Sequence, residues 1–586
     1  MALDLTQEQK NTGAANFAQA AADLTRNPNP ADPTRRTFLK TAAAAGAVLP
    51  VSAAVYFGYS EWQGLGYQPL RVALIGTGDE GGVLIHDHNP EFTQVAAVCD
   101  LRPYNLMRIF TGDGGWDEQK KETKWDGKLP RRGLTNIYGE KAKGIQKFTT
   151  VAELLAKKDE LKLDAVIIAT PLVTHHGIAV ACMNAGLHVL CEKLMARRIE
   201  YCKEMIAAAK KNNVILSVGH QRHYSMLYAH ALEVVNSGVL GDVKHIRALW
   251  HRNNSWPYAA KAGPEIVPGT APYYRDGWCP PIFKMDADAV TPDVLKGITA
   301  VAPNGTAEQC FDDVERLVRW RLYDKPGGGL MAELGSHQLD AASIFLGKVK
   351  PLSVQGVGGK FFYGKGRNDR ESDDGVFVTY EFPGARHPKG GKGGTDPSDV
   401  VVVTYSSFNT NEFESYGECL MGSRGSLVVE KEADAYLFKE SDKAKPADPK
   451  GTNVTVTSKD GKAPVVEAAS TWGGPGNAAV VKPGSATGAA VSRGYREEME
   501  HFAFCVRTQQ KAKLPGSELY KKGADGKFAN AGVLPRCHGE IAMADAVLAL
   551  SANLAMKHKT RIEYKPEWFD GDAVGKGNNP EDGFAS

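Results

Sequence analysis

A glycine-rich turn between two apolar runs is the feature that most constrains the fold of this 586-residue chain. Residues 70–75 form the first run, Gly76-Thr77-Gly78-Asp79-Glu80-Gly81 follows it, and a second run, residues 95–99, ends at Asp100. Strand, glycine turn, helix, strand and acid, in that order, make the dinucleotide-binding βαβ unit. We therefore expect a nucleotide-binding domain at this point of the chain.

The residue types of this motif suit a bound dinucleotide. The three glycines allow a tight turn, a close approach of the backbone to a pyrophosphate, and close packing of the helix on the strand. Asp100 can accept a hydrogen bond from a ribose 2′-hydroxyl and would repel a 2′-phosphate. NAD is therefore favoured over NADP, although Arg102 could weaken that preference. The predicted cofactor contacts are Gly76, Thr77, Gly78, Gly81, Asp100 and Arg102.

Apolar runs and helical segments keep alternating after this unit. Thr150 and Glu153 form a capping box that predicts a helix start. Buried-strand runs at residues 164–169, 187–191 and 214–218 alternate with helical patterns at 175–185 and 198–212. This alternation predicts a parallel, doubly wound α/β sheet.

The pattern changes after Gly219. A helix at 225–237 and a strand at 243–250 lead into a loop-rich stretch, residues 256–310, and then to a helix near 329–346. Adjacent strand-like runs follow at 351–358, 375–382, 400–407 and 425–430, and helices at 494–508 and 538–558. Adjacent strands predict a second domain with an open, largely antiparallel or mixed sheet.

These patterns divide the chain into regions. We expect a leader and export signal at 1–60, an NAD-binding domain at 69–195, a C-terminal substrate and oligomerisation domain at 196–570 with surface insertions near 386–398 and 440–489, and a tail at 571–586.

The N-terminal region predicts export. Thr34-Arg35-Arg36-Thr37-Phe38-Leu39-Lys40 precedes an uncharged run, residues 41–59, as in bacterial twin-arginine signals. Val51-Ser52-Ala53 could be a cleavage site, or the uncleaved run could anchor the protein in a membrane. A basic turn before a buried helix is the alternative. We expect a periplasmic or extracytoplasmic protein that engages the twin-arginine translocase. We also expect residues 1–60 to lie outside the fold.

This route also bears on the cofactor. The twin-arginine system moves folded proteins, and the compartment it serves is not expected to supply free nicotinamide nucleotides. An exported redox enzyme would load its cofactor beforehand and hold it tightly.

Composition narrows the class of partner. Lys and Arg number 70 against 68 Asp and Glu, a net charge of +2, so no overall field would attract nucleic acid or anionic lipid. The nine cysteines have no zinc-ribbon spacing, and their odd number fits a disulfide framework poorly. A small molecule is the expected partner, and no metal is expected.

Lys193 is the sharpest catalytic candidate. Cys191-Glu192-Lys193 stands at the carboxyl end of a predicted parallel strand. Ligands bind at that edge of an open α/β sheet, so Lys193 should face a nicotinamide. The alternative is a solvated lysine in a turn.

Several ordered motifs resemble one family. They are the glycine motif at 76–81, Ala169-Thr170-Pro171 with His175, the run 185–193, Gly219-His220-Gln221-Arg222, residues 238–243, Gly327-Gly328-Gly329, and the run 333–340. This set, over roughly residues 70 to 565, resembles the Gfo/Idh/MocA family, typified by glucose-fructose oxidoreductase and inositol 2-dehydrogenase. The resemblance implies a Rossmann domain followed by an α/β domain whose open sheet commonly forms a dimer interface, and hence a homo-oligomer.

The resemblance also implies site residues. In that family the lysine of a Glu-Lys-Pro motif orients the cofactor and the substrate hydroxyl, and an Asp and a His four residues later bind substrate and transfer protons. The matching positions are Lys193, Glu333 and His337. Leu194 replaces the usual proline, and Glu333 replaces the usual Asp. Thr170, Pro171, His175 and Glu192 are the further cofactor contacts that it implies.

The residues around His337 support this role independently. Glu333 and His337 are four residues apart and would share one helical face, with Asp340 three residues further on. A carboxylate beside an imidazole can orient it and tune its pKa toward that of a general base. The alternatives are a surface ion pair, or a metal site with His175 and His176, for which no compact third-ligand motif is visible.

Aromatic residues between 250 and 278 are candidate sugar contacts. Their flat apolar faces suit the C–H face of a sugar, but the same residues could simply pack within a long loop. The predicted substrate-binding residues are Arg222, Trp256, Tyr258, Tyr274 and Asp340.

Together these features favour an enzyme that moves a hydride between a carbinol carbon of a sugar or polyol and NAD. His337 would act as the base, Lys193 would polarise the hydroxyl, and Glu333 would orient the reacting groups. The first alternative is a glycosidase that oxidises a sugar transiently with bound NAD and then eliminates the aglycone. The second is a non-catalytic carbohydrate-binding protein with the same fold.

Overall fold

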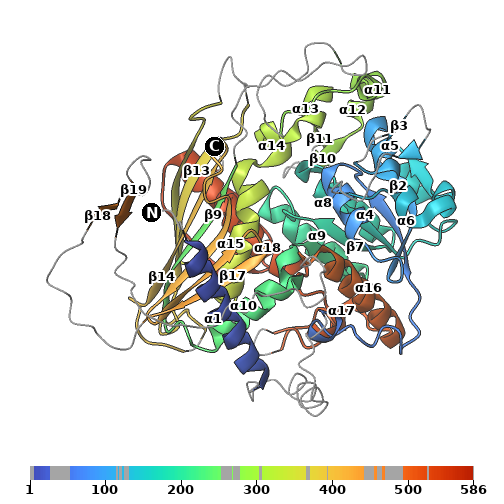
Figure 1. Cartoon of the computed structure of the whole chain (residues 1–586). Coiled ribbons are helices and arrows are strands. Elements are labelled where there is room, and N and C mark those ends of the chain that lie inside the picture. The colour runs from blue at the N-terminus through green and yellow to red at the C-terminus, as the bar shows by residue number, and fades with distance from the viewer. Residues whose placement is uncertain are drawn as a thin grey trace.

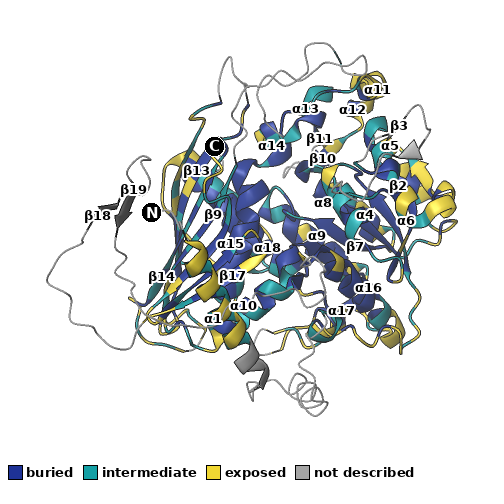
Figure 2. Cartoon of the chain, in the orientation of Figure 1, coloured by how far each residue is buried: buried dark blue, intermediate teal, exposed yellow. Residues whose placement is uncertain are grey.

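The computed structural model of the chain describes residues 5–26, 53–113, 116–117, 122–123, 131–252, 267, 278–301, 307–363, 370–391, 393–440, 454–457, 465–468, 493–523 and 527–584. A parallel sheet and a larger mixed sheet lie on opposite sides of a central group of helices (Figure 1). Burial is concentrated between the two sheets (Figure 2).

The first sheet has six parallel strands in the order β5-β2-β1-β6-β7-β8. The strands are β1 (Leu70–Ile75), β2 (Thr93–Cys99), β5 (Gln146–Phe148), β6 (Ala165–Ile168), β7 (His188–Glu192) and β8 (Leu216–Gly219). The main helices between them are α4 (Asp79–Asp87), α5 (Pro103–Thr111), α7 (Val151–Ala156), α8 (Leu172–Asn184) and α9 (Ile199–Lys211). The predicted doubly wound parallel sheet is confirmed.

Two local details explain these boundaries. Thr150 caps α7 by accepting a hydrogen bond from the Glu153 N–H at 3.2 Å, and the Glu153 side chain bonds back, so the predicted capping box is present. The α8 helix begins at Leu172, before the predicted start at residue 175, because Pro171 stands at its N-cap. Proline suits the edge of a helix because its missing N–H costs nothing there.

The second sheet has eight strands in the order β17-β16-β15-β9-β14-β13-β12-β20. Only β9 and β14 pair in parallel among the described neighbours, so the predicted mixed sheet is confirmed. The strands are β9 (Val243–His251), β12 (Ser353–Gly359), β13 (Gly375–Pro383), β14 (Val400–Phe408), β15 (Tyr416–Gly422), β16 (Gly425–Glu430), β17 (Asp434–Lys439) and β20 (Ile562–Glu563).

Helices fill the space between the sheets. They are α10 (Met226–Asn236), α15 (Ser336–Phe345), α16 (Tyr495–Ala512) and α18 (Gly539–His558). Alternation along β13 buries Val378 against them and leaves Phe377 on the outer face. Within the described residues, α18 alone is long and apolar enough to cross a membrane, but 72% of that stretch is buried inside the fold. Its burial on all sides is typical of a core helix.

The stretch expected to be loop-rich contains a small folded cap over residues 278–322. Its elements are α11 (Lys284–Ala289), α12 (Pro292–Lys296), β10 (Thr299–Val301), β11 (Ala307–Gln309), α13 (Val314–Val318) and η3 (Trp320–Leu322). Leu295 and Phe311 form a separate apolar cluster with Val173 of α8. The cap therefore packs on the parallel-sheet domain, above it in Figure 1.

Parts of the N-terminal segment pack against the rest of the fold, contrary to the expectation that residues 1–60 lie outside it. Helix α1 (Gln7–Arg26) lies along β17 and α10, where Lys10 pairs with Glu430 at 2.8 Å (Figure 1). After α3 (Ala53–Tyr56), Phe57 and Tyr59 are buried in the main core. Large aromatic side chains are stabilised by such burial, which accounts for their place in the fold. Arg35 and Arg36 lie outside the described residues.

The remaining elements are short. They are β3 (Trp116–Asp117), β4 (Glu122–Thr123), α6 (Leu134–Tyr138), η1 (Gly139–Gly144), η2 (Gln221–Tyr224), α14 (Asp324–Gly327), η4 (Met331–Gly335), β18 (Val454–Thr457), β19 (Val465–Ala468), α17 (Gly516–Leu519), η5 (Ala531–Val533), η6 (Pro566–Phe569) and η7 (Pro580–Gly583).

Candidate cofactor cleft and active site

The glycine turn has the geometry that its sequence predicts. Gly76 has a φ of +87°, and a Cβ there would lie 2.5 Å from the carbonyl oxygen of Ala169. A Cβ on Gly81 would lie 2.4 Å from the carbonyl oxygen of Gly76. Only glycine fits either position, so the turn brings the backbone close to β6 and seats α4 tightly on β1. This is the cradle that a dinucleotide pyrophosphate requires.

Asp100 is tied to this turn. Its Oδ2 accepts hydrogen bonds from the Thr77 N–H at 2.8 Å, the Thr77 hydroxyl at 3.1 Å and the Asn105 amide at 3.1 Å. Its Oδ1 accepts from the Arg102 N–H at 2.8 Å. Thr77 therefore orients Asp100, and Asp100 and Arg102 are among the residues that line the adjoining cavity.

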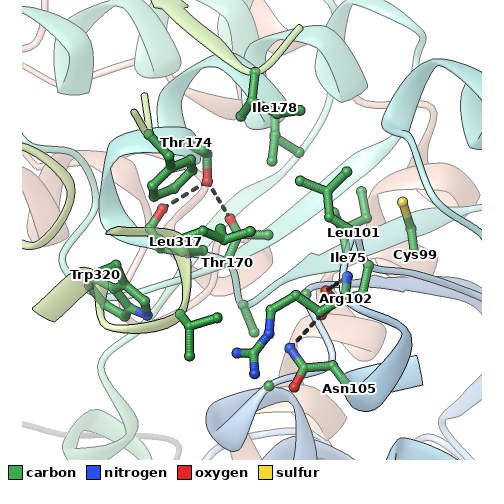
Figure 3. Close-up of a pocket in the computed structure, with 18 of the residues that line it drawn as sticks. Ile75, Cys99, Leu101, Arg102, Asn105, Thr170, Thr174, Ile178, Leu317 and Trp320 are labelled. Atoms are coloured by element: carbon green, nitrogen blue, oxygen red, sulfur yellow. Dashed lines mark hydrogen bonds between the residues drawn. The ribbon is translucent and has the colours of Figure 1, made fainter. Parts of the chain in front are cut away.

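A cavity of about 1110 Å³ runs from this turn to the end of β7. Figure 3 shows Ile75, Arg102 and Asn105 on one side and Thr174, Leu317 and Trp320 on the other. Gly76 and Gly78 line it near Asp100, and Lys193 and Glu333 line it at the far end. Its size and its shape between two walls suit an extended dinucleotide.

The first turn of α4 carries two acids, Asp79 and Glu80, where phosphates would approach. The charge of Asp79 is offset by neighbouring arginines. Asp79 accepts a hydrogen bond from Arg108 at 2.8 Å, and Arg131 lies 3.5 Å away. Burial raises the pKa of Asp79, but these arginines outweigh burial and lower it to about 2. The two cations therefore offset the negative charge of Asp79 beside the phosphate cradle.

Lys193 reaches across the cleft to a widened helical turn. Its Nζ donates to the backbone carbonyl of Glu333 at 2.8 Å, and the Lys193–Leu194 peptide is cis. The helix predicted near residues 329–346 is present, but residues 331–335 form a π-helical turn within it, before α15. Such turns are frequent at functional sites, and this one places Glu333 at the cavity wall.

Glu333 is held as a carboxylate. The guanidinium of Arg321 donates from Nε to Glu333 Oε2 at 2.6 Å. Burial raises the pKa of Glu333, but Arg321 and Lys193 outweigh burial and keep it below the ordinary value. A cation, an anion and a second cation therefore meet at the end of the cleft beside β7.

His337 lies behind this group and is buried. The ring of Trp250 stands 5.5 Å from the His337 ring, centroid to centroid, and stacks on Tyr416 at 4.7 Å. Burial and the positive charge of Lys193 hold the pKa of His337 well below its ordinary value. The imidazole is therefore neutral at physiological pH, in the form that accepts a proton. His337 does not line the main cavity.

Parts of both domains match known protein families. Residues 70–220 match an oxidoreductase family with an NAD-binding Rossmann fold, Gfo/Idh/MocA, and residues 306–428 match the Gfo/Idh/MocA C-terminal domain. These two regions of the chain are thus similar to the two domains of Gfo/Idh/MocA proteins. The first match agrees with the parallel sheet described above, and the second falls on the mixed-sheet domain.

Individual relatives match only part of this chain. A glycosyl hydrolase family 109 protein of Shewanella amazonensis is 28% identical over 240 residues, which are 38% of this chain and 47% of that protein. Inositol 2-dehydrogenase 2 of Saccharopolyspora erythraea is 33% identical over 102 residues, 17% of this chain and 30% of that protein. The chain thus spans less than half the length of these relatives.

A solved structure supports the fold. The inositol dehydrogenase homologue complexed with NAD⁺ from Azotobacter vinelandii is 14% identical to this chain, with a TM-score of 0.50. The match covers 85% of this chain and 98% of that structure.

The other predicted cofactor residues hold the cleft together. Thr170, Pro171, His175 and Glu192 all line it. The two ring nitrogens of His175 lie 2.8 Å from the Thr170 carbonyl and 2.9 Å from the Leu194 carbonyl. His175 therefore joins the ends of β6 and β7. Burial, with the charge of Glu80 nearby, raises the pKa of Glu192 well above its ordinary value.

Two predicted substrate contacts lie below the cleft surface. Arg222 is buried, pairs with Glu432 at 2.7 Å and donates to the Tyr228 hydroxyl at 3.1 Å. Asp340 is also buried and accepts from His223 at 2.9 Å and Lys348 at 2.5 Å. Neither lines the main cavity. Both charged groups pair with internal partners, so the two residues lie beneath the site and not in the cleft.

Three predicted aromatic contacts, Trp256, Tyr258 and Tyr274, lie outside the described residues. Two groups of side chains have metal-ligand spacing, His220-Asp340-Asp545 and His223-Cys537-Asp545. The Lys348 ammonium already lies between Asp340 and Asp545, 3.0 Å from the latter. A lysine there supplies the positive charge that a metal would otherwise bring.

Arg321 and Trp250 are site residues that the sequence analysis did not single out. Arg321 belongs to the Arg319-Trp320-Arg321 run shortly before the glycine triplet, but nothing in its spacing links it to Glu333. Trp250 was one aromatic among several in the interval from 250 to 278. Only the pairing of β9 with β14 and β15 carries it to the wall beside His337.

Proposed function

We propose that this chain oxidises or reduces a hydroxyl or ketone of a sugar, glycoside or polyol, using tightly held NAD. The observation that carries the proposal is the meeting of Lys193 and Glu333 at one end of a dinucleotide-sized cleft, with His337 buried behind them. The nicotinamide supplies hydride transfer when it is bound.

The residues divide the remaining work. Lys193 presents an ammonium to the substrate oxygen and favours the charge that develops there. Neutral His337 accepts the hydroxyl proton during oxidation and returns it during reduction. Glu333, fixed by Arg321, orients the substrate and balances the positive charge of Lys193.

The cap supports tight retention of the cofactor. Phe283 of the cap stacks on Tyr104 of α5, with ring centroids 3.7 Å apart. Glu308 of β11 pairs with Arg197 of the parallel-sheet domain at 2.9 Å. Such contacts hold the cap against the domain beside the cleft, and we expect them to slow the release of a bound dinucleotide.

The substrate class rests on the cleft chemistry and on relatives. A cation, a carboxylate and a neutral imidazole suit a hydroxylated carbon, and the relatives include an inositol 2-dehydrogenase. The test is to release nucleotide from purified protein by acid, identify it, and then titrate sugars and polyols while following reduced-nicotinamide absorbance. Absence of any bound or bindable nicotinamide nucleotide would refute the proposal.

A redox glycosidase is the second candidate, and the match to glycosyl hydrolase family 109 proteins favours it. That route also needs oxidation of a hydroxyl, so the same residues serve it. The two activities differ in turnover. A dehydrogenase with captive NAD stops after one turnover without an acceptor, whereas the glycosidase continues and leaves deuterium on the released sugar in deuterium oxide.

We also propose export through the twin-arginine translocase to the periplasm, on the basis of Arg35-Arg36 and the following uncharged run. Burial of Phe57 and Tyr59 fits a protein that folds before it is moved. Changing both arginines to lysine should keep the folded protein in the cytoplasm in a fractionation assay. Unchanged delivery would exclude this route.

Self-association is a further part of the proposal. The outer face of the second sheet leaves Val357 and Phe377 64% and 46% exposed, and large exposed apolar side chains mark interaction surfaces. A homo-oligomer would cover them. Sedimentation of the purified protein tests this, and a monomer at micromolar concentration would contradict it.

A further inference from the structure

A buried acid from the cap reaches the nucleotide end of the cleft. Asp286 lies on α11 and is fully buried. Its Oδ2 accepts from Nε of Arg102 at 2.9 Å, and its Oδ1 accepts from the Tyr104 N–H at 3.0 Å. The cap thus contacts the first residues after β2 through hydrogen bonds. In this kind of domain, that segment contacts the ribose of the cofactor.

Arg102 is the group that this contact controls. It follows Asp100 by two residues and lines the cavity, and Figure 3 shows its side chain extending into the pocket near Asn105. An unpaired arginine at this place would attract a ribose 2′-phosphate, because its fork of N–H donors suits phosphate oxygens. In this chain Asp286 lies against that guanidinium, with only 16% of the Arg102 side chain exposed.

The charges at this end therefore favour a neutral ribose diol. Asp100 and Asp286 contribute two negative charges and Arg102 one positive charge within a single bonded cluster. A 2′-phosphate would bring about two further negative charges into it. It would have to compete with Asp286 for Arg102 while being repelled by Asp100.

We propose that Asp286 is a positioning residue that sets cofactor selectivity. By pairing with Arg102, Asp286 excludes NADP and leaves the site selective for NAD. The inference rests on the proposed function, because it concerns the same cleft. It assigns part of the selectivity to an acid in the cap, far from the nucleotide motif in the sequence, where the motif alone points to Asp100.

The test compares binding of NAD and NADP to nucleotide-stripped protein by calorimetry, with no dependence on activity. Asp286→Asn keeps an acceptor for the Tyr104 N–H but removes the charge that engages Arg102. It should raise NADP affinity relative to NAD by about tenfold, the value of one charge-assisted hydrogen bond released to the ligand. Asp288→Asn, on the exposed side of the same helix, is the matched control and should change neither affinity.

Two further variants separate selectivity from stability of the cap. Adding Arg102→Ala to Asp286→Asn should abolish the gain in NADP affinity. Arg102→Ala alone should leave the preference for NAD in place. If Asp286→Asn merely loosens the cap, both nucleotides weaken together and the ratio stays constant, which would overturn the proposal.

The failures of the two proposals differ. Protein that binds neither nucleotide before mutation contradicts the proposed function. Unmodified protein that binds NAD, with a ratio that Asp286→Asn does not change, contradicts only the role of Asp286. A preference for NADP in the unmodified protein also overturns it, since Asp286 would then aim Arg102 at the phosphate.

Discussion

The two ends of the cleft are built in different ways. The nucleotide end is formed largely by one continuous segment, in which the Gly76 turn, Thr77 and Asp100 are joined by short-range hydrogen bonds. The catalytic end joins Lys193 of the first domain to Arg321 and Glu333, which are far from it in sequence. The proposed cofactor site can therefore be encoded locally, whereas the proposed catalytic site depends on how the two domains meet.

The electrostatics differ as well. At the proposed catalytic end, burial and the charge of Lys193 lower the pKa of His337, and Arg321 and Lys193 lower that of Glu333 against the effect of burial. At the nucleotide end, hydrogen bonds from backbone and side chains satisfy Asp100 and do the positioning. Mutations at the two ends should thus affect different measured quantities.

Removing Lys193 or His337 should give the largest effect. Lys193→Ala or His337→Ala should lower kcat by at least about a hundredfold, the low end for a general acid–base group. NAD affinity should change far less, because the glycine turn and Asp100 remain. Lys211→Ala, exposed at the end of α9, is the control. Steady-state kinetics with calorimetry would contradict the separation of the two ends if affinity fell as much as kcat.

Asp100→Ala should produce the opposite pattern. Loss of the carboxylate frees the Thr77 N–H and removes the ribose acceptor, so NAD affinity should fall about tenfold and the gap between NAD and NADP should narrow. At saturating NAD, kcat should be unchanged. Asp159→Ala, on an exposed turn, controls for a general effect of losing an acid. Tighter NADP binding in the unmodified protein would exclude the role given to Asp100.

Arg321→Ala should have a pH-dependent effect on the catalytic end. Burial raises the pKa of Glu333, and without Arg321 less positive charge opposes that rise, so part of the population becomes protonated. We expect kcat to fall about tenfold near neutrality and to recover as the pH is raised. Arg316→Ala, whose partners Asp312 and Glu371 lie near the surface, is the control. A loss that is equal at all pH values would rule out this account.

The smallest effect is expected from pH itself on the unmodified protein. The pKa of His337 is well below the ordinary value near 6.5, so the imidazole stays unprotonated as the pH falls from 7.5 to about 5.5. In that window kcat/KM should stay flat, with the fold monitored by circular dichroism. An ordinary histidine would cost about tenfold by pH 5.5, and such a decline would show that His337 is not the base or is not shielded.

The sequence predicted the first domain well because its signals are local. Residues 70–100 carry strand, turn, helix and acid in contiguous order, and the parallel sheet follows from the alternation after them. It predicted the second sheet only in part. Strand β15 contains two glycines and the buried Glu418, so it lacked an alternating pattern, and Glu418 is accommodated only by Tyr228 and Gln338 from other elements.

By itself, the sequence determined the cradle for a dinucleotide and the position of Lys193 at a strand end, because glycine geometry and strand order are fixed by neighbouring residues. Only the tertiary structure decided that Arg321 meets Glu333, that Trp250 stands beside His337, that the cap brings Asp286 to Arg102, and that Arg222 and Asp340 are buried beneath the site. These contacts join residues from different elements of the fold. They depend on tertiary packing, which no local pattern of residues encodes.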